Sequence, residues 1–261
     1  MKKLSGFQLK IISLVFMCID HIHTFFGYEL GLPRWLHWPG RFVAPVFLYL
    51  LMEGFKYTRN RKKYLTRLFL ASMFMHLVNI VKNIVTKSYI HPVTHAFDPF
   101  ALLSGNNIFW TLFLFMVLFL FLDKLTGPEK KGSKKWLLPI AFTIPLLIFS
   151  EGGLYLLPIA LACFFFDNDP KKVSLSLFVW SILLFIKTMY SYLSYGHEVM
   201  SLYQQLTYSS EFLLMTAIPF ILAYNGKRGG TGKKWEKNLF YVFYPAHLIL
   251  LNILSIVVSA R

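Results

Sequence analysis

Long apolar runs separated by short polar segments dominate the chain. A transmembrane helix needs roughly 17–25 mostly apolar residues, and the sequence offers such runs near residues 7–27, 40–56, 65–85, 106–123, 136–150, 152–167, 173–194, 211–225 and 239–258. Prolines and glycines interrupt the two runs within 136–167, which favours a kinked hairpin there over two complete crossings. The pattern predicts an all-α, polytopic membrane bundle of about nine helices, with a range of seven to ten.

Composition supports this class of protein. The chain is 56% hydrophobic and only 15% charged, against about 25% charged residues in soluble domains. Its net charge of +15 comes mainly from the segments 56–67, 123–135, 169–172 and 225–237. The positive-inside rule places such loops, and with them the N-terminus, in the cytoplasm, so the basic charge does not call for nucleic acid as a partner. No repeat or separate soluble region is visible, and we expect one transmembrane domain over residues 1–261.

The first apolar run carries ionisable residues in its second half. A charged side chain at the centre of a bilayer costs at least ~2.5–3.5 kcal/mol, yet Asp20 and His21 lie together near mid-depth. Lys10 precedes His21 by eleven positions, which puts both on one helix face about 16 Å apart along the axis. An acid and an imidazole in this position indicate a functional site rather than a purely architectural one.

Three further polar residues are expected at a similar depth in other helices. His76 and Asn79 lie in the third run and His247 in the last, so we expect them to converge with Asp20 and His21. Simpler interpretations remain open: His76 and Asn79 as interhelical hydrogen-bonding residues, and His247 as a partner for backbone groups freed by Pro245. No HExxH or CxxC spacing occurs, so no metal is predicted. What remains is a histidine acting as a general base.

Four blocks of the sequence resemble the TraX family. They are LSGFQLKIISLVFMCIDHIHTFF (4–26), GRFVAPVFLYLLMEGFKYTRNRKKYLTRL (40–68), AYNGKRG (223–229) and LFYVFYPAHLILL (239–251). Residues 86–210 match weakly, mainly at NNIF (106–109). The family is named after the factor that acetylates the N-terminus of F-type pilin. It is similar to the larger class of acyltransferase 3-like transmembrane enzymes, whose first helix carries a basic residue, ten intervening positions and a histidine, as Lys10 and His21 do here.

The resemblance implies a membrane-bound O- or N-acetyltransferase in the bacterial cytoplasmic (inner) membrane. Lys10 would hold the phosphates of acetyl-CoA and His21 would be the catalytic base. We expect Asp20 to orient His21, and Asn79, His76 or His247 to donate to the thioester oxyanion. Further partners for the CoA phosphates are expected among the basic loops: Arg59, Arg61, Lys62, Lys63, Lys227, Arg228, Lys233 and Lys234.

The acceptor and the reaction class stay open at this point. A peptide or protein N-terminus, a lipoprotein amine or another lipid-linked group, an amino sugar or a glycan hydroxyl would all suit the same base. The competing function is a proton-coupled membrane transporter that uses the Asp20/His21 pair. A third is an assembly or scaffold protein for a secreted polymer. Dependence on acyl-CoA separates the first function from the other two.

Overall fold

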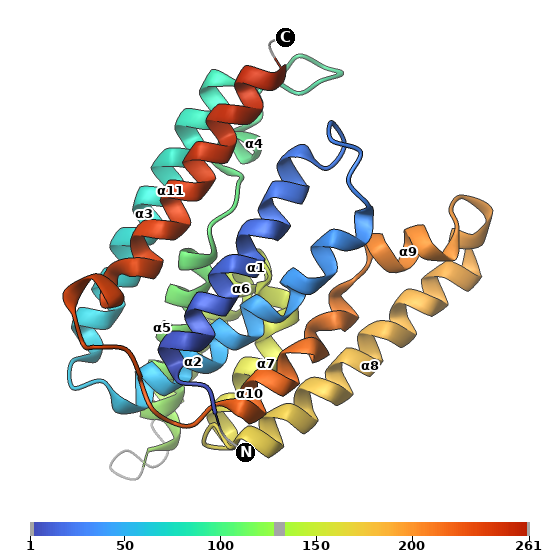
Figure 1. The fold of residues 1–261 in the computed structure, drawn as a ribbon. Helices are drawn as coiled ribbons and strands as arrows, with labels where there is room; N and C mark the ends of the chain where they lie inside the picture. The colour runs from blue at the N-terminus through green and yellow to red at the C-terminus, as the bar shows by residue number, and fades with distance from the viewer. Residues whose placement is uncertain (1–2, 128–133, 260–261) are drawn as a thin grey trace. The chain divides into compact units, whose positions relative to one another are not determined.

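The structure is a computed structural model that describes residues 3–127 and 134–259, and its regular elements there are helices (Figure 1). Extended pairing in the described residues is limited to two isolated bridges, Leu4 with Tyr224 and Ile90 with Phe97. The predicted all-α class is therefore confirmed.

Five of the described helices are long and apolar enough to cross a membrane. They are α1 (Gly6–Phe26), α3 (Arg61–Val85), α5 (Ile108–Thr126), α8 (Pro170–Ser194) and α11 (Lys234–Ser259). A sixth crossing results if α9 (Leu202–Tyr208) and the segment Glu211–Ala223, which are bent by 64°, form one broken span. The chain thus has the helices of a multi-pass membrane protein, but the predicted count of about nine is not confirmed.

The remaining apolar runs are helical but too short for a full crossing. They form α2 (Val43–Tyr57), α6 (Leu137–Ile148), α7 (Gly153–Phe165), and η5 (Glu211–Ala217) followed by α10 (Ile218–Ala223), where η denotes a 3-10 helix. The run predicted at 40–56 begins inside η1 (Arg34–Phe42), which contains Pro39, and only then becomes α-helical. Between α6 and α7 the chain turns at Gly152, whose φ of 69° is in the left-handed region that favours glycine.

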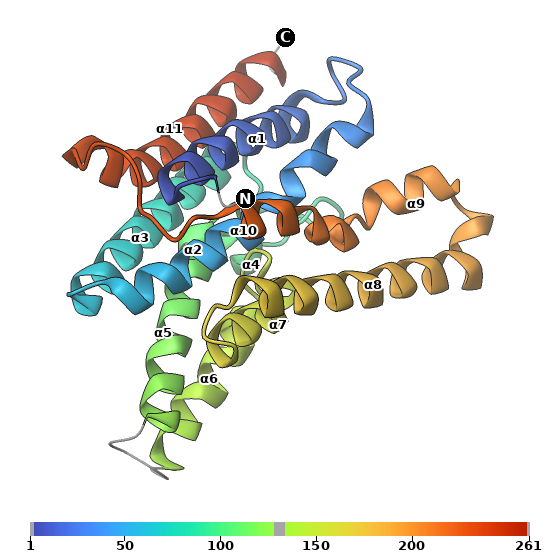
Figure 2. The same cartoon turned by 60° about the horizontal axis from the view of Figure 1, so that its bottom comes forward.

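The chain forms two compact units. The first comprises Met1–Met52 and Pro158–Leu251. In it α1 packs on η1, while α8 lies beside η5 and α10, as both views show (Figures 1 and 2). Tyr49 of α2 is buried and donates its hydroxyl to the carbonyl of Asn168 (2.9 Å), the residue just before the α8 N-cap. This bond attaches α2 to the α7–α8 turn.

The second unit comprises Glu53–Leu157 and Asn252–Arg261. Here α3 packs on α4 (Pro99–Leu103) and α5, and α5 packs on α6 (Figure 2). Side-chain amides join the segment before α5 to α3: Asn83 donates to three carbonyls of residues 101–104, and Asn107 donates to the carbonyl of Ser72 (3.0 Å). The buried amides of Asn83 and Asn107 thus find partners in backbone carbonyls.

Polar side chains fix where the long helices start. Asp169 caps α8 by accepting from the backbone N–H groups of Lys171 and Lys172. These hydrogen bonds, that of Lys172 first, lower the pKa of the Asp169 carboxyl because they stabilise its charged form. Asn60 and Asn107 cap α3 and α5 in the same way.

Candidate active site

Two histidines from opposite ends of the chain meet in the first unit. Nδ1 of His21 in α1 lies 2.7 Å from Nε2 of His247 in α11, and both residues are 7% exposed. The two rings are inclined by 9° with centroids 5.0 Å apart. Since their nearest nitrogens are much closer than their centroids, the rings are joined edge to edge by an in-plane hydrogen bond rather than stacked.

The next hydrogen bond fixes the direction of the proton. Nδ1 of His247 lies 2.8 Å from the carbonyl of Phe243, which can only accept, so this nitrogen carries the hydrogen. Neutral His247 then presents a lone pair at Nε2, and the proton between the rings belongs to Nδ1 of His21. Nε2 of His21 therefore keeps its lone pair, and among the described residues no hydrogen bond occupies it. This is the tautomer that a general base requires.

The gap that Pro245 leaves in the helix hydrogen bonding does not explain the hydrogen bond that His247 makes. A proline at this position lacks the N–H that would reach the carbonyl of Tyr241 four residues earlier, whereas His247 donates to the carbonyl of Phe243. The pair is surrounded by aromatic rings: Phe243 lies parallel to His247 at 5.1 Å, and Tyr244, itself 1% exposed, contacts both imidazoles. The enclosed setting excludes most water from the pair.

A basic loop is fastened to the start of α1. Ser5 caps the helix, with its Oγ accepting from the backbone N–H of Gln8. The next two N–H groups, of Gly6 and Phe7, donate to the carbonyls of Lys227 (2.9 Å) and Arg228 (2.8 Å). The helix terminus is thus saturated by backbone, and the exposed side chains of the loop are left facing outward.

These contacts bring three of the predicted phosphate-binding residues together. Lys10, Lys227 and Arg228 are exposed on the first turns of α1 and on the loop bound to them. Arg228 is close enough to Lys10 for the two positive charges to repel, and Glu236 in the first turn of α11 is the carboxylate near Arg228. A concentration of cations of this kind is suited to a polyanion.

Asp20 faces a different neighbour from the one we expected. A Cβ added to Gly40 of η1 would lie 2.7 Å from the Cβ and 2.8 Å from the Cγ of Asp20, so this side chain packs directly on the glycine backbone. Its electrostatic partners are Arg41 and His23. Neighbouring positions on a helix point about 100° apart, and Asp20 accordingly lies on the η1 side of α1 while His21 is held by α11.

His76 and Asn79 belong to the second unit. His76 contacts the ring of Trp110 edge-on at 5.6 Å, and Asn79 donates to the carbonyl of Asn106 (3.1 Å). Their contacts there are the interhelical and loop-anchoring ones that the simpler interpretation describes.

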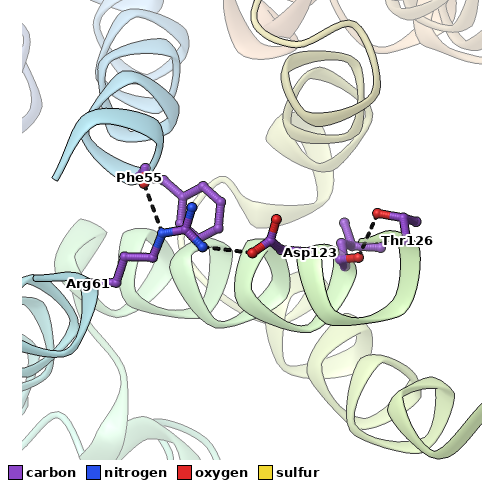
Figure 3. Close-up of polar contacts among 5 residues, drawn as sticks. Phe55, Arg61, Asp123 and Thr126 are labelled. Atoms are coloured by element: carbon purple, nitrogen blue, oxygen red, sulfur yellow. Dashed lines mark hydrogen bonds and ion pairs between the residues drawn. The ribbon is translucent and has the colours of Figure 1, made fainter. Parts of the chain in front are cut away.

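Arg59, Arg61 and Lys62 also lie in the second unit, at the turn between α2 and α3. Figure 3 shows Arg61 lying over the ring of Phe55 (4.0 Å to its centroid) and bonded to Asp123 of α5 (2.7 Å). Nε of Arg61 also donates to the Phe55 carbonyl (3.2 Å). Arg61 thus joins α5 to the α2–α3 turn, whereas Arg59 and Lys62 are exposed.

A second group of polar residues lies in the first unit around η1. His37 of η1 bonds through Nε2 to the carbonyl of Thr207 and to Oγ of Ser210, each at 3.1 Å. Arg41 donates from Nε to the same hydroxyl (2.9 Å), which is fully buried. Burial lowers the pKa of His37, and the charges of Arg41 and His23 lower it further, against hydrogen bonds to the Arg34 and Thr207 backbone that raise it. The sequence signal for this group is Arg41 at the outer edge of the run 40–56, where a cation needs a partner or water, together with the polar loop LHWPGR (36–41).

Comparison with known proteins places this chain in a family. The family model described as "TraX protein" matches residues 5–255, nearly the whole chain. The chain belongs to the TraX family. A curated relative is the protein named "Probable fimbrial assembly protein FimC, serogroup H1" of Dichelobacter nodosus. It is 25% identical over an alignment of 261 positions, which covers 95% of this chain and 94% of the relative. No solved structure matches.

The TraX match extends across the central region that resembled the family only weakly in sequence, and it includes both histidines of the pair and the basic loop. Among the described residues no group of three or more His, Cys, Asp or Glu side chains could hold a metal ion.

Proposed function

We propose that this TraX protein is a membrane acyltransferase that moves an acetyl or short acyl group from acyl-CoA to an amine or hydroxyl acceptor. His21 is the general base, and the protein lies in the bacterial cytoplasmic membrane with its N-terminus in the cytoplasm. The observation that carries the proposal is the hydrogen-bonded series from His21 to His247 to the Phe243 carbonyl, which leaves Nε2 of His21 as the basic atom.

In the proposed reaction His21 handles one proton twice. Nε2 of His21 takes the proton from the acceptor as that group attacks the thioester carbonyl carbon. The carbon–sulfur bond then breaks, and His21 returns the proton to the leaving CoA thiolate. Positive charge on His21 is stabilised by its Nδ1–H···Nε2 bond to His247, because His247 passes polarisation on to the Phe243 carbonyl. General-base catalysis of this kind contributes about 10²–10⁴ in rate.

The donor site is proposed at the start of α1. Lys10, Lys227 and Arg228 supply cations for the phosphates of CoA, which cannot enter lipid. Lys10 and His21 are about 16 Å apart along the helix, a separation that an extended pantetheine arm can bridge. One rigid helix, α1, therefore carries both the cation that would bind the CoA phosphates, near its first turns, and the base, in its second half.

The acceptor is suggested only broadly by relatives. The name of the D. nodosus protein refers to fimbrial assembly, and the family name refers to pilin acetylation. A protein N-terminus is accordingly the first acceptor to try, with lipid-linked amines and glycan hydroxyls after it.

Calorimetry with the purified protein in detergent tests the donor, using wild type, Lys10→Ala and His21→Ala. We expect micromolar acetyl-CoA binding that weakens at least tenfold in Lys10→Ala and is retained in His21→Ala, while acyl transfer is lost in His21→Ala. Lys87→Ala, a loop lysine of the second unit, is the matched control. Absence of acetyl-CoA binding in folded wild-type protein refutes the proposal and favours a transporter.

A further inference from the structure

The glycine-rich segment NGKRGGTGK, residues 225–233, lies between α10 and α11 in the first unit. We call it the 225–233 loop. Its composition is that of a flexible linker, because glycine leaves the backbone free to adopt many conformations. In the structure, however, both edges of the loop are fastened to helices, and the fastening points indicate a function for a residue that has had none so far.

One edge of the 225–233 loop is held by the start of α1. The backbone N–H of Asn225 donates to the carbonyl of Leu4 (2.9 Å), and the carbonyls of residues 227–228 accept from α1 as described above. Gly229 packs directly on Ser5, the N-cap of α1, since a Cβ added to Gly229 would collide with the Ser5 side chain. This edge therefore follows the first turn of α1 closely.

The other edge of the loop is held by a carboxylate. Glu236 lies in the first turn of α11 and is 7% exposed. Its Oε1 accepts from the backbone N–H and from the hydroxyl of Thr231 (2.7 Å each), and its Oε2 accepts from the backbone N–H of Gly232 (2.9 Å). Gly230 packs on the same carboxylate, because a Cβ added there would lie 2.5 Å from Oε2. Both oxygens of Glu236 are thus engaged by the loop.

The positive charges of the site are not neutralised by these contacts. In the described part of the chain, none of Lys10, Lys227 and Arg228 forms a salt bridge. The backbone N–H groups of Gly229 and Gly230 make no hydrogen bond to any described residue either. Cations and unused backbone N–H groups in one short segment are the donors that bind phosphate oxygens.

We propose that Glu236 is a positioning residue of the donor site, which holds the 225–233 loop in the conformation that binds the phosphates of the acyl donor. The inference rests on the proposed function for the identity of that donor. Lys227 and Arg228 contribute charge, and the N–H groups of Gly229 and Gly230 contribute directed hydrogen bonds. Because Glu236 orders the loop before the ligand arrives, binding does not carry the entropic cost of ordering a glycine-rich segment.

Replacing Glu236 distinguishes positioning from simple charge by the direction of the effect. A carboxylate repels a polyanion, so by charge alone Glu236→Ala would tighten acetyl-CoA binding. If Glu236 positions the loop, we expect Kd for acetyl-CoA to rise at least tenfold in Glu236→Ala, because three hydrogen bonds that order the loop are lost. Unchanged or tighter binding in Glu236→Ala overturns the inference.

Two further variants complete that comparison. Glu236→Gln removes the same charge as Glu236→Ala but keeps an oxygen that can accept from Thr231, so it should recover part of the affinity for acetyl-CoA. Glu198→Ala, which removes an exposed carboxylate elsewhere in the first unit, should leave the affinity unchanged. If Glu236→Gln binds no better than Glu236→Ala, the hydrogen bonds do not position the loop and the inference is wrong.

A pair of glycine variants perturbs the same contact without changing any charge, and it also serves if Glu236→Ala does not fold. Gly226 and Gly230 have φ angles of 74° and 75°, so alanine strains the backbone similarly at both positions. A Cβ at Gly230 meets the Glu236 carboxylate, whereas a Cβ at Gly226 has nothing within 4 Å. We expect Gly230→Ala to raise Kd for acetyl-CoA at least tenfold and Gly226→Ala to raise it by a smaller factor. Equal rises would attribute the effect to backbone strain and overturn the inference.

Calorimetry with adenosine 3′,5′-bisphosphate, a phosphate-bearing part of CoA that carries no acyl group, keeps the two proposals distinguishable. The probe is titrated into full-length protein in detergent beside acetyl-CoA. Binding that weakens in Glu236→Ala and recovers in Glu236→Gln supports the phosphate site even if no acyl transfer is found, a result that would refute only the proposed reaction. Acetyl-CoA binding that is equal in wild type and all Glu236 variants overturns this inference and leaves the acyltransferase proposal standing. Folded wild-type protein that binds neither probe refutes both.

Discussion

Replacing His247 by alanine tests whether the histidine pair works as one unit. In the wild-type structure the Nδ1 proton of His21 is donated to His247 over 2.7 Å in a buried site. His247→Ala removes that acceptor and leaves the Nδ1–H of His21 without a partner. The ring then has no reason to prefer the tautomer with the lone pair at Nε2, and its imidazolium form loses a stabilising bond.

The expected size of the effect follows from those two losses. An unsatisfied buried donor costs about 1–3 kcal/mol, and every 1.36 kcal/mol of barrier is a factor of ten in rate. We therefore expect kcat for acetyl transfer to fall by about 5- to 150-fold in His247→Ala, less than in His21→Ala, which removes the base and loses about 10²–10⁴. His247→Gln, whose side-chain oxygen can accept from His21, should recover part of the rate.

The assay is steady-state transfer from acetyl-CoA at saturating acceptor, with KM for acetyl-CoA measured alongside. His197→Ala, an exposed histidine of the same unit, serves as the control for loss of an imidazole. The double variant His21→Ala/His247→Ala should be no slower than His21→Ala alone, because His247 acts through His21. Wild-type kcat in His247→Ala, or independent and multiplying losses in the double variant, would show that the pair does not act as described.

Three further outcomes are expected from the first unit. Gly40→Ala should cost about 1–3 kcal/mol of stability, measured by thermal unfolding in detergent, because its methyl would overlap Asp20. An unchanged unfolding temperature would show that η1 can shift away from α1 at no cost. Tyr49→Phe should cost about 0.5–1.5 kcal/mol by removing the donor to the Asn168 carbonyl, and no loss would mean that another donor replaces it. Folding lowers the pKa of His37 from its ordinary value of about 6.5. Just below pH 6.5 the unfolded chain therefore binds more protons at this residue than the folded chain does. Wild-type stability should thus fall more steeply below that pH than that of His37→Gln, and parallel curves would contradict this.

The positions of the helices could be read from the sequence, but their continuity could not. Each of the apolar runs became helical because a buried backbone must satisfy its own polar groups. Apolarity does not report where a helix breaks, however. The run at 40–56 starts as a 3-10 segment around Pro39, and the run at 211–225 divides into η5 and α10. The predicted number of about nine crossings is therefore not confirmed.

For the site, the sequence predicted how deep each candidate residue lies in its membrane span. Depth alone does not say which neighbouring helix a residue faces. It was enough to expect His21 and His247 near each other, which is how the structure places them. It could not tell which neighbour each face of α1 would meet, so Asp20 was assigned to His21 when its contacts are with η1. Depth also could not show that the contacts of His76 and Asn79 are with other residues of the second unit.

On the proposed roles, one helix sets the geometry of the whole reaction. α1 carries Lys10 and the attached basic loop at its start, His21 in its second half, and Asp20 on the adjoining face toward η1. A rigid α-helix keeps such groups at fixed separations of about 1.5 Å per residue, so the proposed donor site and the base are positioned relative to each other by α1 itself. Changes in the second unit that leave the fold intact, such as breaking Arg61 from Asp123, should accordingly alter stability more than KM for acetyl-CoA.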